Sequence, residues 1–340
     1  MPVASEPDRF RNVTPLFLLG IARSGTTLIQ SLLDGHPQLL VDVYDSRFNH
    51  WYKKYHRWTD ALRTWRDGRE ERLAFAERMM VEHIFNEPSQ YYRDFLSYIS
   101  IPEIKELFRG FVRASQARPQ DYLEAYFHAL GIASKRLNEK TLYWVDKTLS
   151  YEYLFYRYHQ WWPNARFIYV VRDPRDVYAS YKKRDLKNNR PVIPLDSFAI
   201  VWGDAARALL DCQRSVPAAN RFILRYEDLI HDTEGVMRSV AQFLGIDFLP
   251  AMLQPTKGFG SVPWGGNAES GRKQFGVYQD AANKWQGVLT SKEITQLEGL
   301  LHREMREVGY ELSAPLRTDA TLSTKLAVRR AFFGLLNLGL

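Results

Sequence analysis

The segment PLFLLGIARSGTTLIQSLLDGHP, residues 15–37, has the spacing of a phosphate-binding loop. An apolar run ends at Gly20, a second glycine follows at Gly25, and Thr26 opens a helical pattern. A strand that turns into a helix in this way directs backbone N–H groups and the positive end of the helix at one anion. The residues expected to form this cradle are Ser24, Gly25, Thr26 and Thr27.

The lysine of the common nucleotide-binding loop is missing from this segment. The pattern G-x-x-x-x-G-K-[ST] is matched at both glycines, but Thr26 stands where the lysine belongs. In a nucleoside triphosphatase that lysine reaches the β- and γ-phosphates, and a hydroxyl holds Mg²⁺. Its loss argues against γ-phosphate chemistry, and Arg23 offers a cation from inside the loop instead.

The loop resembles the 5′-phosphosulfate-binding loop of the sulfotransferases, a family that uses 3′-phosphoadenosine 5′-phosphosulfate (PAPS) as its donor. The resemblance rests on the R-S-G-T-T run, the helical pattern after it and the His-Pro pair. Ala22 stands where the family often has proline. The resemblance implies that Ser24 to Thr27 bind the 5′-phosphate through their amides and that Arg23 acts on the sulfonate.

A second segment, FIYVVRDPRDVYASYKKR at residues 167–184, is similar to the family's 3′-phosphate-binding stretch. There a strand ends on an arginine and a serine follows eight residues later on a helix, a spacing that Arg172 and Ser180 match. Arg184 matches a further phosphate-contacting arginine of the tyrosylprotein branch and falls on the helical face of Ser180. The resemblance assigns all three side chains to the 3′-phosphate.

A third segment, WVDKTLSYEYL at residues 144–154, resembles the family's strand-end segment that carries a lysine. Lys147 is present, although Leu149 stands where proline is usual. The resemblance implies that Lys147 is catalytic and acts with Arg23 on the sulfonate and the bridging oxygen of the donor.

The remaining resemblances lie in the second half of the chain. In the RYEDL run, Tyr226 matches a tyrosine that lies near the adenine and the 3′-phosphate. Lys284 and Trp285 resemble a C-terminal K-W element. Arg272 and Lys273 resemble the basic 3′-phosphate clamp, at a longer spacing from Trp285 than in the cytosolic branch.

The base that takes the acceptor's proton is harder to place. In tyrosylprotein and many glycan sulfotransferases a glutamate follows the His-Pro pair by several residues, and this chain reads HPQLLVDVYDSRF there. With one extra residue allowed, Asp45 takes that place and Asp42 is its rival. Cytosolic small-molecule members use a histidine instead, and His128 and His159 are present without a motif to anchor either.

These resemblances imply in-line transfer of a sulfuryl group from PAPS to a hydroxyl, or less favourably to an amine. Positioned cations and amides meet the charge on the leaving oxygen, so no metal is required. The alternatives are a nucleoside-triphosphate-dependent kinase with a degenerate loop and a non-catalytic protein that binds PAPS or sulfated glycans. An anionic peptide or glycan acceptor would be drawn by the cations Lys182, Lys183, Lys187 and Arg190.

Four short β-rich runs must position these residues. They are residues 16–19, 142–145, 167–171 and 222–225, and each leads towards a helical pattern. We therefore predict an α/β fold, a P-loop-like sulfotransferase fold whose central parallel sheet is flanked by helices. Residues 52–138 lack convincing strands and are interpreted as a helical insertion that covers the site and holds the acceptor.

Two further helices and a long loop are predicted in the later chain. Asp232 caps a helix that Gly245 ends, and apolar residues repeat at helical spacing over residues 294–308. Residues 258–276 are rich in glycine and form a loop of the length that often serves as a lid.

Length and composition bound the class of protein. With 340 residues, of which 45% are hydrophobic, the chain can form one sulfotransferase domain over residues 1–340. The net charge of +7 suits a polyanionic ligand, but no RNA-binding signature indicates nucleic acid. Cys212 is the only cysteine, which excludes intramolecular disulfides and multi-thiolate metal sites, and we expect it to be a small buried residue on a helix.

The two ends of the chain bear on its location. The N-terminal residues lack the shape of a signal peptide, so a cytoplasmic protein is expected. Residues 311–340 include an apolar stretch with two arginines at its head. We interpret this tail as a docked helix, with contact to a membrane surface or an oligomer interface as the alternatives.

Overall fold

The computed structural model describes most of the chain and all of its central sheet. The described residues are 12–42, 44–56, 68–82, 99–149, 152–265, 267 and 276–313. The sheet has five parallel strands in the order β2-β3-β1-β4-β5. They are β1 (Thr14–Gly20), β2 (Leu39–Val41), β3 (Tyr143–Leu149), β4 (Arg166–Val171) and β5 (Arg221–Arg225).

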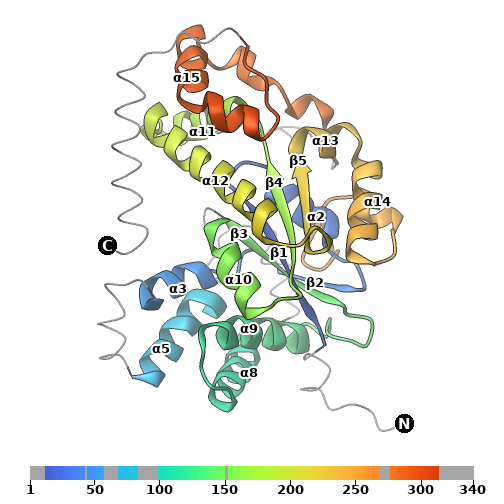
Figure 1. The fold of residues 1–340 in the computed structure, drawn as a ribbon. Coiled ribbons are helices and arrows are strands. Elements are labelled where there is room, and N and C mark those ends of the chain that lie inside the picture. The colour runs from blue at the N-terminus through green and yellow to red at the C-terminus, as the bar shows by residue number, and fades with distance from the viewer. Residues whose placement is uncertain are drawn as a thin grey trace.

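Helices surround this sheet (Figure 1). Those before β4 are α2 (Thr26–Leu33), α3 (Phe48–His56), α5 (Arg69–Ala76), α8 (Ile101–Ala114), α9 (Pro119–Ala133) and α10 (Phe155–Trp161). Those after it are α11 (Pro174–Lys187), α12 (Leu195–Ser215), α13 (Tyr226–His231), α14 (Thr233–Leu244) and α15 (Ser291–Glu307). A π-helical turn, Glu77–Glu82, continues α5. A small antiparallel hairpin pairs β6 (Thr256–Lys257) with β7 (Val262–Pro263).

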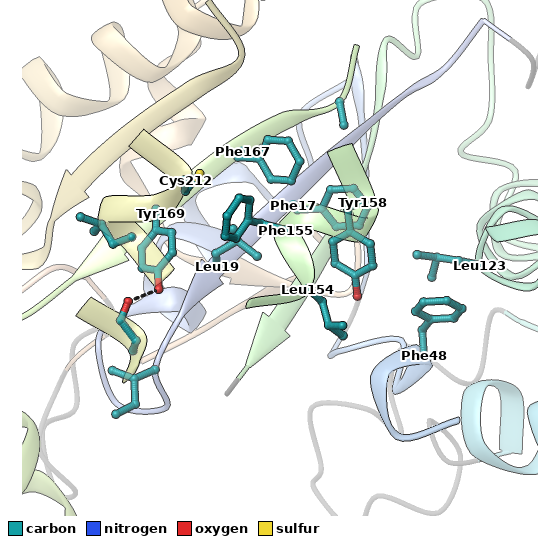
Figure 2. Packing of buried hydrophobic residues seen from close by; sticks show 14 of the residues in the cluster. Phe17, Leu19, Phe48, Leu123, Leu154, Phe155, Tyr158, Phe167, Tyr169 and Cys212 are labelled. Carbon is teal, nitrogen blue, oxygen red and sulfur yellow. Dashed lines mark hydrogen bonds between the residues drawn. The ribbon is translucent and has the colours of Figure 1, made fainter. Parts of the chain in front are cut away.

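The sheet separates two hydrophobic cores, because successive residues of a strand point to opposite faces. Leu16 and Leu18 of β1 lie in one core with residues of α2, α13 and α14. Phe17 and Leu19 lie in the other core, with residues of α9, α10, α12 and α15. Figure 2 shows this second core, in which Phe17 stacks on Tyr158 of α10 with ring centroids 4.2 Å apart. Helices therefore cover both faces, as predicted.

β1 lies at the centre of the sheet, between β3 and β4. The chain leaves β1 towards β2 on one side and later passes through β4 to β5 on the other. In open parallel sheets, ligands bind outside the carboxyl ends of the strands at such a point of divergence. The segments that follow Gly20, Leu149, Val171 and Arg225 all begin at this edge.

The four predicted strands are confirmed. The structure adds β2, which was not predicted because a strand of three residues is too short to give a clear pattern. β3 extends to Leu149, beyond the predicted residues 142–145, so Lys147 lies within a strand rather than after one. The predicted α14 is confirmed, since Asp232 caps its start and Gly245 ends it in the left-handed conformation. Cys212 is fully buried in α12.

The described residues between 52 and 138 are helical and contain no strand. The helical segment begins earlier than predicted, because α3 starts at Phe48. α3, α5, α8 and α9 gather at one end of the molecule (Figure 1). α9 joins this group to the sheet, where Phe127 stacks on Trp144 of β3 with centroids 4.4 Å apart. The role of this segment in holding an acceptor stays a prediction.

Some predictions fall outside the described residues. These are the roles of Arg272 and Lys273 and nearly all of the tail at residues 311–340. Among the helices that the structure describes, none is long and apolar enough to cross a membrane.

Candidate active site

A cavity of about 850 Å³ opens at the carboxyl edge of the sheet. Its wall contains Leu149 at the end of β3 and residues from the segments after β1, β4 and β5. The predicted donor-site residues that line it are Arg23, Gly25, Thr26, Thr27, Arg172, Ser180, Arg184 and Tyr226, whereas the predicted residues Ser24, Lys147 and Asp45 are not part of its wall. The lining residues lie far apart in the sequence, and the order of the strands brings them together.

The loop between β1 and α2 is built on two glycines. Gly25 precedes α2 with a φ of 106°, and a Cβ there would lie 2.3 Å from the ring of Tyr226. At Gly20, a Cβ would lie 2.6 Å from the carbonyl oxygen of Val170. Both positions therefore require glycine. No side chain caps α2 at Gly25, and the N–H of Leu28 already donates to the carbonyl oxygen of Gly25 at 2.9 Å. The N–H groups directed at an anion are therefore those of Thr26 and Thr27.

Three arginines converge on the cavity. Nε of Arg23 donates a hydrogen bond to Oγ of Ser180 at 2.9 Å. Arg172 donates to the carbonyl oxygens of Arg23 at 3.2 Å and Ala281 at 2.8 Å. Enclosure, and then the positive charges of Arg184 and Arg172, lower the pKa of the Arg23 guanidinium. Because these like charges repel one another, the arrangement favours a multiply charged anion beside them.

Two buried polar atoms in the cavity region have no hydrogen-bond partner among the described residues. One is Nε of Arg172, a residue of the cavity wall whose guanidinium lies over the ring of Tyr226, 4.2 Å from its centroid. The other is Oγ of Ser24, which lies inside the loop and not in the wall. Buried polar atoms are normally paired, so the unpaired Nε of Arg172 indicates a ligand that completes the site.

One face of α11 brings further cations to the cavity. Lys183 and Lys187 line it together with Ser180 and Arg184. These positions follow Ser180 at the spacing of a single helical face. The charge of Arg184 is partly balanced, because its guanidinium pairs with Asp185 at 2.6 Å.

The prediction that the basic run on α11 is left free for an acceptor is wrong in part. Nζ of Lys182 donates to the carboxylate of Glu293 on α15 at 2.7 Å. Lys183 and Lys187 belong to the wall of the donor cavity instead. The basic run is therefore divided between an ion pair with α15 and the wall of the cavity.

Lys147 lies directly behind the loop. Its Nζ donates to Oγ1 of Thr27 at 3.3 Å, and only 3% of the residue is exposed. Burial lowers the pKa of Lys147, while the carboxylates of Asp45, Asp42 and Asp146 oppose that shift. An ammonium at this position can reach past Thr27 towards a group bound at the loop.

The carboxylates around Lys147 differ in their burial. Asp42 accepts a hydrogen bond from the hydroxyl of Tyr126 at 2.8 Å, and burial, then the charge of Asp146, raises its pKa to about 7. Burial likewise raises the pKa of Asp146 to about 6. The side chain of Asp45 is 18% exposed and accepts from the backbone N–H of Arg47 at 3.2 Å. Asp45 therefore lies at the solvent edge of the cluster, and Asp42 lies inside it.

The two candidate histidines lie elsewhere. His128 stacks on Phe111 of α8 with ring centroids 3.8 Å apart, and burial lowers its pKa to about 4. His159 lies edge-on to Phe167 of β4 at 6.2 Å. Neither residue lines the cavity.

Sequence reasoning missed Trp264 and Asn267, which line the cavity from the segment after β7. Asn267 donates to the hydroxyl of Tyr226 at 3.1 Å and to the carbonyl of Tyr278 at 2.7 Å. No motif marks either residue within the predicted long loop. Lys183 and Lys187 could have been identified from their helical spacing after Ser180.

Comparison with known proteins distinguishes the sulfotransferase interpretation of this site from the kinase and the non-catalytic alternatives. Residues 15–250 match the model of the sulfotransferase family. The chain belongs to this family. The sulfotransferase is 22% identical over 317 residues to protein-tyrosine sulfotransferase A of Caenorhabditis elegans, an alignment that covers 90% of this chain and 70% of that protein. It is 34% identical over 104 residues to omega-hydroxy-beta-dihydromenaquinone-9 sulfotransferase Stf3 of Mycobacterium tuberculosis, which covers 27% of each protein.

A solved structure shows the same fold. The sulfotransferase domain of the Synechococcus PCC 7002 olefin synthase has a TM-score of 0.55 and 20% identity, over 91% of this chain and 99% of that one. The protein is thus an enzyme, a PAPS-dependent sulfotransferase. The kinase and non-catalytic alternatives are not favoured.

Proposed function

We propose that the cavity binds PAPS with its 5′-phosphate at the β1–α2 loop and its 3′-phosphate at Arg172, Ser180 and Arg184. The residues present fit such a ligand, because a buried donor of the cavity wall, Nε of Arg172, lacks a partner in the described structure. Three arginines face each other there and favour an anion, although Asp176 and Asp185 balance part of the charge of Arg172 and Arg184. PAPS supplies the activated sulfuryl group; the chain supplies its binding and orientation.

The catalytic assignments concern the part of the site around Lys147 and the acidic cluster beside it. Nζ of Lys147 donates to Thr27, and Arg23 lies within the loop itself. We assign both cations to the charge that develops on the leaving oxygen and on the transferred group. We assign the acceptor's proton to Asp45, because its carboxylate is the more exposed member of the acidic cluster and can meet an incoming hydroxyl. Asp42 is held by Tyr126 in the interior.

The acceptor proposed for this enzyme is a hydroxyl. The relatives are named for protein tyrosine, for an omega-hydroxy dihydromenaquinone and for carbohydrate, the last being human carbohydrate sulfotransferase 2, 34% identical over 26% of this chain and 17% of that protein. All three classes offer a hydroxyl. An acidic peptide or a glycan remains the proposed kind of molecule.

The observation that carries the proposal is the convergence of Arg23, Arg172 and Arg184 with an unpaired donor on Arg172. Calorimetry should therefore show that adenosine 3′,5′-bisphosphate binds much more tightly than AMP. Arg172→Ala should weaken the bisphosphate by about one to two decades, the scale of a charge-assisted hydrogen bond, and AMP little. Arg303→Ala, an exposed arginine on α15, is the control. Equal losses for both ligands would remove Arg172 from the 3′ site.

A second measurement addresses the reaction itself. Lys147→Ala should retain the affinity for adenosine 3′,5′-bisphosphate while sulfuryl transfer falls on the order of 10² to 10³-fold, as when one transition-state donor is removed. Lys140→Ala, on the exposed turn before β3, should transfer at the normal rate. Near-normal turnover by Lys147→Ala would contradict the catalytic role.

A further inference from the structure

The hairpin of β6 and β7 is fixed to the far end of α2. The carboxylate of Asp34, just after α2, accepts hydrogen bonds from the hydroxyl of Thr256 at 3.0 Å, the N–H of Phe259 at 3.0 Å and the N–H of Gly260 at 2.7 Å. The two backbones touch, since a Cβ on Gly35 would lie 2.7 Å from Cα of Gly260. The hairpin is thus held against the helix that begins at the phosphate loop.

Lys257, the last residue of β6, is buried without a hydrogen-bond acceptor. Only 7% of the residue is exposed, and its Nζ lies 5.1 Å from the ring centroid of Trp264, a residue that lines the cavity. Within the described part of the chain, no hydrogen bond runs from this Nζ to an oxygen or nitrogen, and the atom is not among the fully buried unpaired ones. An ammonium that has lost most of its hydration is stabilised when an anion binds beside it.

The charges that face Lys257 come from three elements. Burial, and then the positive charge of Lys147 on β3, lowers the pKa of Lys257 to about 7. Asp34 after α2 and Asp42 after β2 oppose this shift only in part. Lys147 in turn faces Asp42, Asp45 and Asp146. Lys147 therefore faces three carboxylates, whereas Lys257 faces two carboxylates and the positive charge of Lys147.

We propose that Lys257 is a second sulfonate-binding lysine of the donor site, which donates a hydrogen bond to the transferred sulfonate alongside Lys147. This inference rests on the placement of PAPS proposed above. The sulfonate would provide the acceptor that Nζ of Lys257 lacks, and its charge would hold the proton on that amine. Adenosine 3′,5′-bisphosphate has no sulfonate, so it should gain nothing from Lys257.

The test compares the two nucleotides by calorimetry without any acceptor. Lys257→Met keeps the length of the side chain and removes its charge, so the variant should melt at the same temperature or higher. It should bind PAPS about 10-fold or more weakly, the scale of one charge-assisted hydrogen bond, and bind the bisphosphate normally. Lys140→Met, an exposed lysine, is the matched control and should change neither affinity.

Proton uptake gives an independent readout. At pH 7.5, in buffers of different ionisation enthalpy, PAPS binding should take up a fraction of a proton that the bisphosphate does not, and Lys257→Met should reduce that uptake. Lys257→Arg should keep the PAPS affinity. Equal losses for both nucleotides, an unchanged PAPS affinity, or an unchanged uptake in Lys257→Met would each overturn the role of Lys257. Failure of the wild type to bind either nucleotide would overturn the donor site instead.

Discussion

Asp45 and Asp42 lie three residues apart, yet the fold gives their carboxylates different surroundings. Asp45 is partly exposed, whereas Asp42 is buried against Tyr126. Asp45→Asn should lower kcat by roughly 10² to 10⁴-fold with donor affinity kept, because a general base is lost. Asp42→Asn should retain far more of the rate. Steady-state kinetics of the two variants would decide, and a dead Asp42→Asn beside an active Asp45→Asn would exchange their roles.

The buried carboxyl of Asp42 should also control stability with pH. Burial raises its pKa from 3.8 to about 7, so between these values the folded state holds a proton that the unfolded state has lost. The free energy of unfolding should therefore fall as the pH rises through this window. Asp42→Asn should flatten this fall and melt several degrees above the wild type at pH 8, but not at pH 4.

Thermal denaturation at several pH values provides this measurement. Asp146 acts in the same direction up to about pH 6, because burial raises its pKa too. Part of the fall in the free energy of unfolding with rising pH should therefore remain in Asp42→Asn. A variant whose slope equals that of the wild type would show that Asp42 is ionised in the folded protein.

At the scale of elements, the loop and α13 depend on each other through Gly25. A side chain at this position would meet the ring of Tyr226 and would need a φ of 106°. Gly25→Ala should therefore displace Tyr226 and weaken adenosine 3′,5′-bisphosphate by about tenfold or more, as expected when a charge-assisted contact is lost. Gly110→Ala on α8, where a Cβ has open space, should keep full affinity.

The sequence predicts the elements that carry long apolar patterns or a motif. The four longer strands follow from their apolar runs, and the loop at Gly20 to Thr27 follows from the spacing of its glycines. The positions of Arg172 and Ser180 follow from the resemblance to the family's 3′-phosphate-binding stretch. β2 has only three residues, too few for a period to emerge. Its pairing with β3 is decided by contacts across the sheet, which no local pattern records.

The parts of the site that could not be predicted come from the segment around β6 and β7. Trp264 reaches the cavity because Asp34 holds the hairpin against α2. Those hydrogen bonds join residues more than two hundred positions apart. The backbones also meet at Gly35 and Gly260, which have no side chain that could show a pattern in the sequence. Lys257 gives no signal in the sequence, since a lysine in a short polar run is usually solvated.

At the scale of the whole molecule, the enzyme should work without a metal. In the proposed placement of PAPS, the charge of the donor would meet Arg23, Lys147 and the amides at the start of α2. Dialysis against EDTA should therefore leave the rate of sulfuryl transfer unchanged. A loss that Mg²⁺ restores would contradict this account of how the charge is balanced.

The central position of β1 has a consequence for synthesis on the ribosome. Thr14 pairs with Tyr143 and Leu16 pairs with Arg166, so β1 gains its neighbours only after well over a hundred further residues have been made. At roughly 5 to 20 residues per second, this apolar strand waits on the order of ten seconds. During this time, the unpaired apolar strand β1 is exposed to aggregation. The β1–α2 loop is thus translated well before the strands that complete the sheet around it.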